Sequence, residues 1–222
     1  MPEILTSVLA PFALGAFFWT FMEYVLHRFA FHERRGANYG SREHLRHHAK
    51  RDYTVDTQVL AWVGVLIVGL GVLNVGARLL FGPLVGWSFG IGFVVGYFTY
   101  EWLHAAAHLW APRTSYGHWL RRHHFHHHFA EPLRNHGVTI PLWDHVFGTY
   151  SPSDTVTVPR RLAMRWLLDE AGDVREGHRG EYRVRGRRTD LASDEADRAF
   201  ANLPPVLDDG PAAPAEVPVG TR

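Results

Sequence analysis

Residues 84–108 read LVGWSFGIGFVVGYFTYEWLHAAAH, an apolar run that ends in two histidines. No residue before its single glutamate is charged, and His104 and His108 are four positions apart, about one helical turn. A helix rises about 1.5 Å per residue and a hydrocarbon core is about 30 Å thick, so a span that starts near Leu84 reaches the far interface around the first histidine. The sequence therefore predicts one helix that crosses a membrane, carries both histidines at or just beyond the interface and ends before Pro112.

Two further apolar runs lie before this one. Residues 4–26 are uncharged up to Glu23, and residues 58–81 contain Arg78 as their only charged residue. Each run has about the 20 residues that a helix needs to span a bilayer, and three such runs are hard to bury in so small a soluble domain. The first run lacks the basic start of a signal peptide and continues directly into His27. We therefore predict an all-α fold, an integral-membrane helical bundle with about three transmembrane helices.

Spans that alternate in direction place the histidine groups on one side of the membrane. The end of the first run, the start of the second and the end of the third share that side, and each of these ends lies beside histidines. The segment between the first two runs is rich in Arg and Lys, whereas the N-terminus and the turn at 82–86 have none. Because Arg and Lys are enriched in cytoplasmic loops, we predict a multi-pass protein whose histidine-rich helical cap and C-terminus are cytoplasmic.

Composition predicts where the membrane domain ends. Residues 1–160 hold the apolar runs and all but one of the histidines, and we assign them to one membrane-embedded domain with a dimetal site. From about Asp169 the chain is rich in Arg, Asp, Glu, Gly, Ala and Pro, with few apolar side chains to offset the entropy of ordering. Residues 161–222 are therefore predicted to form a cytoplasmic tail, disordered at least from Asp208.

The chain has sixteen histidines and no cysteine. Without cysteine there is no disulfide, no thiolate zinc site and no cysteine-ligated iron–sulfur cluster, so imidazole is the ligand that the sequence offers to a transition metal. A formal net charge of +1 gives no reason to expect nucleic-acid binding. Four groups have the spacing of metal ligands: His27 and His32; His44, His47 and His48; His104 and His108; His124, His127 and His128.

Spacing within each group predicts which histidines can reach one ion. On a helix, positions i, i+3 and i+4 lie in one stripe, so each His-x2-His-His triplet fans three imidazoles widely enough to reach two neighbouring metals. His27 and His32 are five apart, roughly 140° around an ideal α-helix, so either the helix breaks between them or they serve different ions. The ten grouped histidines are too many for one ion and suit two ions with five nitrogens each. Neutral imidazole favours iron, copper or zinc.

The other six histidines have weaker claims to a metal. His123 and His126 lie in the dense run but off the triplet frame, which disfavours a ligand role. The loop residues His136 and His145 could contact the ligands or the substrate. The last two, one before the dense run and one in the predicted tail, are expected on the solvated surface: His118 and His178.

Three carboxylates lie near the histidine groups. Glu23 lies four residues before one ligand histidine and Glu101 three residues before another. Either could accept a hydrogen bond from the distal ring nitrogen of its histidine, or pair with an arginine at the interface. Asp144, after a tryptophan, is more typical of a turn or cap than of a ligand.

The order and spacing of these motifs resemble the fatty acid hydroxylase/sterol desaturase superfamily of histidine-rich membrane diiron oxygenases. The resemblance covers roughly residues 15–150, and the first pair and the fourth group look most like fatty acid 2-hydroxylases. It rests on six segments: His27-Arg-Phe-Ala-Phe-His32, Glu43-His44-Leu-Arg-His47-His48, Glu101-Trp-Leu-His104-Ala-Ala-Ala-His108, His124-Phe-His-His127-His128-Phe129, Asn135-His-Gly137-Val138-Thr139 and Trp143-Asp144-His-Val-Phe147-Gly148-Thr149.

That resemblance implies an enzyme with two iron ions, held by the ten grouped histidines, and O2 as co-substrate. It implies hydroxylation or desaturation of a C–H bond in a membrane lipid, as a step of lipid biosynthesis. The chain lacks the His-Pro-Gly-Gly signature of a fused cytochrome b5, so electrons would come from a separate carrier, a ferredoxin or a cytochrome b5-like protein with its reductase. Five aromatic residues are candidate walls for a lipid chain or, alternatively, membrane anchors: Phe29, Phe31, Trp102, Trp119 and Phe125.

Other functions stay open at this point. A carotenoid or isoprenoid ring hydroxylase has the same chemistry, but its first two groups are expected to lie closer together than His32 and His44. A metal transporter or metal-binding sensor would place polar residues along a path through the spans, whose interiors are apolar here. A zinc-dependent membrane hydrolase normally needs a carboxylate base near the metal and fewer ligands. The sequence favours the lipid oxygenase.

Overall fold

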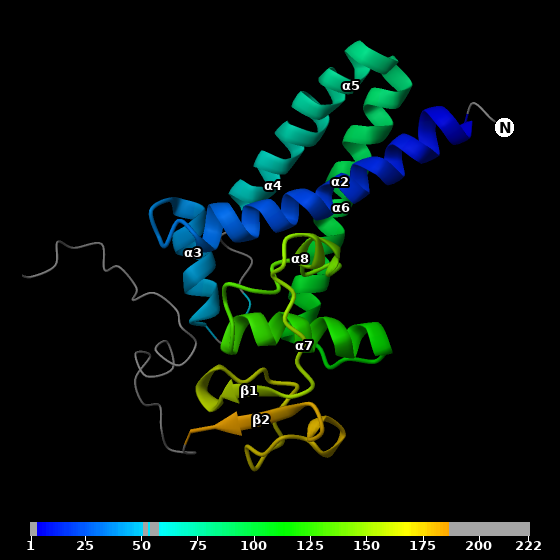
Figure 1. The fold of residues 1–222 in the computed structure, drawn as a ribbon. Coiled ribbons are helices and arrows are strands. Elements are labelled where there is room, and N and C mark those ends of the chain that lie inside the picture. The colour runs from blue at the N-terminus through cyan, green and yellow to red at the C-terminus, as the bar shows by residue number, and fades with distance from the viewer. Residues whose placement is uncertain (1–3, 51–52, 54–57, 187–222) are drawn as a thin grey trace, which may run out of the picture.

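The computed structural model describes residues 4–50, Tyr53 and residues 58–186 (Figure 1). It is mostly helical, as predicted, with two short strands. The helical elements are η1 (Leu5–Leu9), α2 (Ala10–Val25), η2 (Leu26–His32), α3 (Tyr39–His48), α4 (Val59–Leu66), η3 (Ile67–Leu73), α5 (Asn74–Phe81), α6 (Pro83–Leu109), α7 (Ser115–Phe129), α8 (Leu142–Val146), η4 (Arg160–Leu162) and η5 (Glu176–His178). The strands are β1 (Val156–Pro159) and β2 (Tyr182–Arg185).

Several of these elements join into long helices. The first three form one helix over Leu5–His32, and α4, η3 and α5 form another over Val59–Phe81. Their η segments are wound as π-helix rather than α-helix, with the turn closing over five residues instead of four. A tight turn at Gly82, whose φ is 92°, then reverses the chain into α6, which begins on Pro83. Glycine tolerates this positive φ and proline suits the first turn of a helix, so the two residues predispose the chain to the hairpin of α5 and α6.

Close glycine contacts hold α2 against α6. A Cβ atom added at Gly92 would lie 2.0 Å from the carbonyl oxygen of Phe12, and one added at Gly15 would lie 2.1 Å from that of Phe89. Without side chains at these two positions the backbones can approach directly, as small residues allow in membrane helix pairs. Beside this contact Trp19 packs edge-on against an α6 ring, with ring centroids 5.3 Å apart. The two helices therefore form a tightly packed pair.

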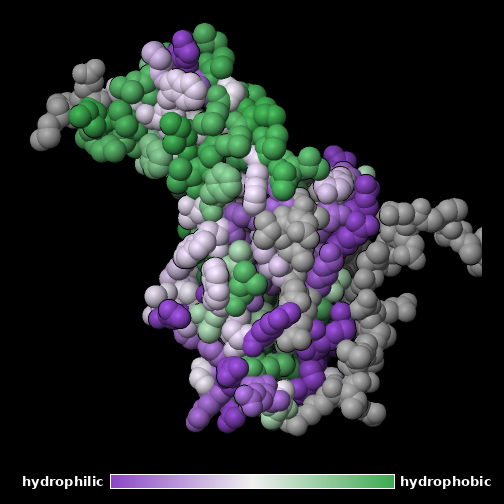
Figure 2. Space-filling model, turned by 180° about the vertical axis from the view of Figure 1, so that it is seen from behind, coloured by the Kyte–Doolittle hydropathy of each residue, from purple (hydrophilic) through white to green (hydrophobic). Residues whose placement is uncertain are grey.

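Apolar side chains cover one end of the molecule on its outer surface. Figure 2 shows them over the end that holds the N-terminal helix and the hairpin, while polar residues cover the other end. Leu5–His32 and Val59–Phe81 are long and apolar enough to cross a membrane, and only 11% of each apolar window is buried inside the protein. A soluble core helix would be mostly buried, so these surfaces fit a lipid environment. The third predicted span stays a prediction, although α6 carries an exposed apolar stripe of Leu84, Trp87, Ile91 and Val95.

The polar end contains α3, α7, α8 and a two-stranded parallel sheet, in which Val156 pairs with Tyr182 (Figure 1). Leu162, Met164 and Leu167 are buried between this sheet and α7. Residues 161–186, the described part of the predicted tail, thus contribute to a core shared with α7. The disorder expected from Asp208 concerns residues outside the described ranges. The domain assignment itself stays a prediction.

Candidate metal centre

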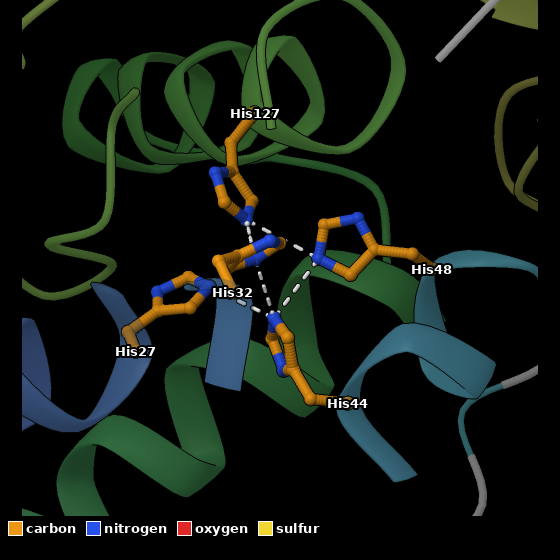
Figure 3. A group of neighbouring side chains, drawn as sticks. All are labelled: His27, His32, His44, His48 and His127. Carbon is orange, nitrogen blue, oxygen red and sulfur yellow. Dashed lines mark hydrogen bonds between the residues drawn. The ribbon is translucent and has the colours of Figure 1, made fainter. Parts of the chain in front are cut away.

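The ten grouped histidines converge on two neighbouring points in the structure. Within each group one ring nitrogen from every member lies within 4.8 Å of the others. Group A contains His27, His32, His44, His48 and His127 (Figure 3). Group B contains His47, His104, His108, His124 and His128. The division into five and five agrees with the sequence-based count.

Group A depends on the π-helical winding of η2. Its two members His27 and His32 are five residues apart, a separation that would point them about 140° apart on an α-helix. In a π-helix, residues five apart lie above one another on successive turns. The hydrogen bond from the Glu33 amide to the Arg28 carbonyl, at 2.9 Å, shows this winding. The two imidazoles therefore face the same point. Both alternatives from the sequence were wrong: the helix does not break, and the two histidines do not belong to different groups.

The triplets of α3 and α7 each divide between the groups. His47 of α3 belongs to group B while its two partners belong to group A, and His127 of α7 belongs to group A while its two partners belong to group B. At the junction the rings of His48 and His128 stack with centroids 4.0 Å apart and an angle of 4°. Side-chain caps set the start of both helices, because Asn38 accepts a hydrogen bond from Ser41 and Thr114 from Gly117.

Distances between the Nε2 atoms match those expected between metal ligands. In group A the Nε2 atom of His44 lies 2.8 Å from that of His32, 3.0 Å from that of His27 and 3.0 Å from that of His48. First-row metals bind imidazole nitrogen at about 2.1 Å, so ligands at right angles lie about 2.9 Å apart. In group B the Nε2 pair of His47 and His104 lies at 2.9 Å. The donor set therefore fits a nitrogen-ligated transition metal in each group.

Burial keeps the ligand imidazoles neutral. Desolvation, with smaller contributions from the nearby His27 and Lys50, lowers the pKa of His47 to about 3. Desolvation is also the main cause that lowers the pKa well below the ordinary value for the other grouped histidines of α3 and α7: His44, His48, His124, His127 and His128. A neutral imidazole offers a lone pair to a metal, whereas a protonated one cannot bind it.

A loop over residues 134–149 orients two ligands of group A. The carbonyl oxygen of His136 lies 2.6 Å from Nδ1 of His27, and the carbonyl of Arg134 lies 2.6 Å from Nδ1 of His127. A proton on each Nδ1 leaves the Nε2 lone pair directed at the group, the arrangement that ligand histidines usually have. Asp144 holds the loop in turn, because it accepts hydrogen bonds from the amides of His136 and Gly137, both at 2.8 Å. Sequence reasoning missed these carbonyls, since any residue can supply one.

Two of the three carboxylates have other partners than those considered from the sequence. Glu23 accepts hydrogen bonds from the amide of Thr139 at 2.8 Å and from its hydroxyl at 2.6 Å, so it ties this loop to α2. Glu101 accepts a hydrogen bond from the Tyr53 hydroxyl. Neither holds a ligand histidine, and neither makes the expected arginine pair in the contacts of the described residues. Asp144 serves as the predicted turn residue.

The six ungrouped histidines lie in different surroundings. His123 is buried with Nε2 3.1 Å from the Gly137 carbonyl, and His126 lies 3.2 Å from the Ser151 hydroxyl. His145 is exposed and stacks on Tyr150. His136 is buried behind group A, with its ring centroid 5.3 Å from that of His27. The last two, predicted on the solvated surface, are partly exposed and lie together near Glu181: His118 and His178.

Two adjoining cavities reach the centre. The first, which we call the inner cavity, has a volume of about 350 Å³ and lies between the apolar helices. Val65 and Phe93 are among its lining residues, and it ends at His27. The second, which we call the outer cavity, has a volume of about 310 Å³ and is more polar. Lys50 and His47 are among its lining residues. The two cavities meet beside the histidines, because four residues line both of them: Phe31, Gln58, Ala61 and Tyr100.

Of the five aromatic residues considered as walls for a lipid, Phe31 lines both of these cavities. Phe29 and Trp102 are exposed, in keeping with the alternative role of membrane anchors. Phe125 is buried in the core around the sheet, and Trp119 packs against that core.

Comparison with known proteins gives matching sequences over the same region. The family model for fatty acid hydroxylase matches residues 12–149, which include all ten grouped histidines. Fatty acid 2-hydroxylase of Mus musculus is 33% identical over 161 residues, covering 69% of this chain and 42% of that protein. Dihydroceramide fatty acyl 2-hydroxylase FAH1 of Arabidopsis thaliana is 32% identical over 164 residues, covering 72% of this chain and 66% of that protein. The chain thus spans 42% to 66% of the length of these two relatives.

A solved structure titled "Full length scs7p (only hydroxylase domain visible)" aligns with a TM-score of 0.48 and 23% identity, covering 66% of this chain and 57% of that one. The two long apolar helices and the family match favour a membrane protein. The extent of the family match, over more than half of the residues and through the whole histidine centre, leads to one conclusion: the chain belongs to the fatty acid hydroxylase family.

Proposed function

We propose that this protein is a membrane-bound oxygenase that hydroxylates a C–H bond of a lipid, with two iron ions in groups A and B. The observation that carries the proposal is the pair of five-histidine groups, with Nε2 contacts of 2.8 to 3.2 Å, at the end of an apolar cavity. Iron bound at such a nitrogen-rich site, supplied with electrons, would provide the O2 chemistry that an unactivated C–H bond requires. Desaturation of the same bond is the alternative outcome of this chemistry.

The residues of the chain would have three tasks in this reaction. The grouped histidines hold the ions and, being buried and neutral, keep their lone pairs available at pH 7. The carbonyls of Arg134 and His136 keep two of these rings in one orientation. The apolar walls of the inner cavity exclude water from the reacting carbon and hold the chain that carries it.

The two cavities suggest how a lipid would bind. An acyl chain suits the inner cavity between α2, α4 and α6, and a polar head group suits the outer cavity beside Lys50, Glu43 and Tyr39. Where the cavities meet, a carbon near the head group would lie next to the histidines. The names of the two relatives, fatty acid 2-hydroxylase and dihydroceramide fatty acyl 2-hydroxylase, support an acyl substrate of this kind. A carotenoid ring hydroxylase has no such support.

For the membrane arrangement we propose three spans with the histidine centre at the cytoplasmic face. The apolar stripe on α6, its packing against α2 and the polar surface around the sheet support this arrangement (Figures 1 and 2). Arg and Lys between the first two spans support the cytoplasmic side. Electrons would come from a separate ferredoxin or cytochrome b5-like carrier with its reductase.

Expression of the full chain in cells that contain long-chain lipids tests the activity. Under 18O2 the lipid extract should gain hydroxylated acyl chains that carry the label, and the purified protein should contain about two irons. A single bound zinc together with an unchanged lipid profile would contradict the oxygenase. An unlabelled hydroxyl group would contradict O2 as its source.

A longer side chain in the inner cavity should shorten the acyl chain that the protein accepts. Gly64 lines this cavity, and a Cβ atom added there meets nothing within 4 Å. The Gly64→Leu variant should therefore fold and lose about tenfold in product from long chains relative to short ones, because several methylene groups lose their place. Competition between acyl chains of different length in one assay measures this ratio.

Gly76→Leu is the matched control, since Gly76 is in the same long helix, also has open space around its Cβ position and does not line the inner cavity. An equal change of chain-length preference in both variants would remove the inner cavity as the acyl site.

A further inference from the structure

A third group of possible metal ligands lies in the C-terminal part of the fold, on the side of α7 opposite to groups A and B. His118 is on the first turns of α7, His178 ends the short helical turn η5, and Glu181 directly precedes β2. One nitrogen or oxygen atom of each lies within 4.8 Å of the others. None of the three residues belongs to group A or group B. His118 lies within residues 12–149, which the family model matches, and His178 and Glu181 lie outside them.

The three side chains are arranged as ligands of one ion would be. Nδ1 of His118 lies 2.7 Å from Oε2 of Glu181, and the rings of His118 and His178 have centroids 6.1 Å apart. Nδ1 of His178 is buried and has no hydrogen-bond partner among the described residues. A buried polar nitrogen without a partner is unfavourable, and a metal ion would give it one. Two imidazoles and one carboxylate are a ligand set that Zn²⁺ commonly takes, with a water molecule in the fourth place.

The backbone around this group is already held in place. The amide of Glu181 donates to the carbonyl of His178 at 3.0 Å, and the carbonyl of Glu181 accepts from the amide of Val156 in β1 at 2.8 Å. Tetrahedral zinc ligands lie about 3.3 Å apart, so side-chain rotations that shorten the longest separation by at most about 1.5 Å would complete the site.

The contact between Arg122 and Glu181 allows a different interpretation of this group. Its guanidinium pairs with Oε1 of Glu181, so the group could be an ion-pair network that fastens β2 to α7. The ion pair does not involve His178, whose ring packs edge-on against Trp166 with centroids 5.1 Å apart and whose Nδ1 still has no hydrogen-bond partner among the described residues. A carboxylate has two oxygens, so Oε2 remains available to an ion while Oε1 stays with Arg122.

We propose that His118, His178 and Glu181 bind a zinc-type divalent cation, separate from the dimetal centre, which ties the η5–β2 segment to α7. α7 also carries three of the grouped histidines, so the ion would brace the helix from its other end. The proposal does not depend on the oxygenase function.

Zinc binding by the full-length protein, with its histidine centre already filled with iron, tests the proposal. In equilibrium dialysis against micromolar Zn²⁺, the wild type should bind about one zinc that His178→Ala does not bind. His145→Ala, which removes an exposed histidine outside all three groups, should bind as the wild type does. Glu181→Gln keeps the shape and hydrogen-bonding capacity of the side chain, and it should also lose this zinc. Equal zinc binding by all four proteins would overturn the proposal.

Arg122→Gln separates the two readings of the group, and also serves if His178→Ala fails to fold. Removal of the cation beside Glu181 should strengthen zinc binding, by about fivefold, because a repulsive charge is gone. In the ion-pair reading the variant gains no zinc affinity, and zinc does not raise its thermal unfolding temperature. That result would also overturn the proposal.

Discussion

Replacement of His127 by alanine is expected to remove the metal of group A and at least about 99% of the hydroxylated product. The side chain is fully buried, and its Nε2 atom lies 3.0 Å from that of His32 and 3.2 Å from that of His48. Loss of a residue that merely supports a metal ligand typically costs 10- to about 100-fold in affinity or activity, so loss of a ligand should cost at least as much. Metal analysis should show iron falling from about two per chain to about one, and lipid mass spectrometry should show the loss of product.

The adjacent residue provides the control. His126 is on the same helix, but its ring contacts Ser151 and Glu131 and belongs to neither group. His126→Ala should therefore keep two irons and nearly all of the activity. If the two variants lose iron equally, the effect comes from damage to α7, and the assignment of His127 as a ligand is wrong. Circular dichroism of the metal-free proteins shows whether the helix is intact in both.

Acidification is expected to destabilise the metal-free protein steeply between about pH 6.5 and pH 5. Burial, with a smaller effect of nearby charges, lowers the pKa of His47 from 6.5 to about 3 and that of the other grouped histidines of α3 and α7 well below 6.5. Below pH 6.5 the unfolded chain therefore binds protons that the folded protein cannot bind. Stability is complete above the unfolded pKa and falls as the pH drops toward the folded pKa, by up to about 1.4 kcal/mol per histidine for each pH unit.

Chemical unfolding of the metal-free protein at pH 7.5, 6.5 and 5.5 measures this effect. The midpoint should change little between the first two values and drop sharply at the third. The metal-loaded protein should show the same direction, because protons and metal compete for the same nitrogen lone pairs. A midpoint that stays constant from pH 7.5 to 5.5 would mean that the grouped imidazoles are not buried as the structure has them.

The sequence was sufficient for the candidate ligands and for most of the helices. Eight of the ten grouped histidines were identified from spacings of three and four residues, which depend only on helical geometry, and His27 and His32 from a spacing of five. The apolar runs 4–26 and 58–81 predicted the two long helices because length and hydropathy are local properties. Asp144 was recognised as a turn residue for the same reason, since an aspartate beside a turn bonds nearby amides.

The tertiary structure decided how these pieces combine. Sequence spacing cannot show that η2 winds as a π-helix, because this winding is stabilised by contacts with α3, α7 and the loop over 134–149. It also cannot assign each histidine to group A or B, since the partners of His32 and His47 lie 95 and 57 residues away. Nor does composition show that Leu162 and Met164, at the start of the predicted tail, are buried in a core with residues of α7.

The physical reason for this division is the range of the interactions. Helical periodicity and hydropathy act over a few residues, so the sequence by itself determined the helices, the candidate ligands and the apolar runs. Which nitrogens meet depends on close packing between segments far apart in the chain, such as the glycine contacts of α2 with α6. Only the folded structure therefore decided that ten imidazoles form two groups of five, and that His118, His178 and Glu181 form a third.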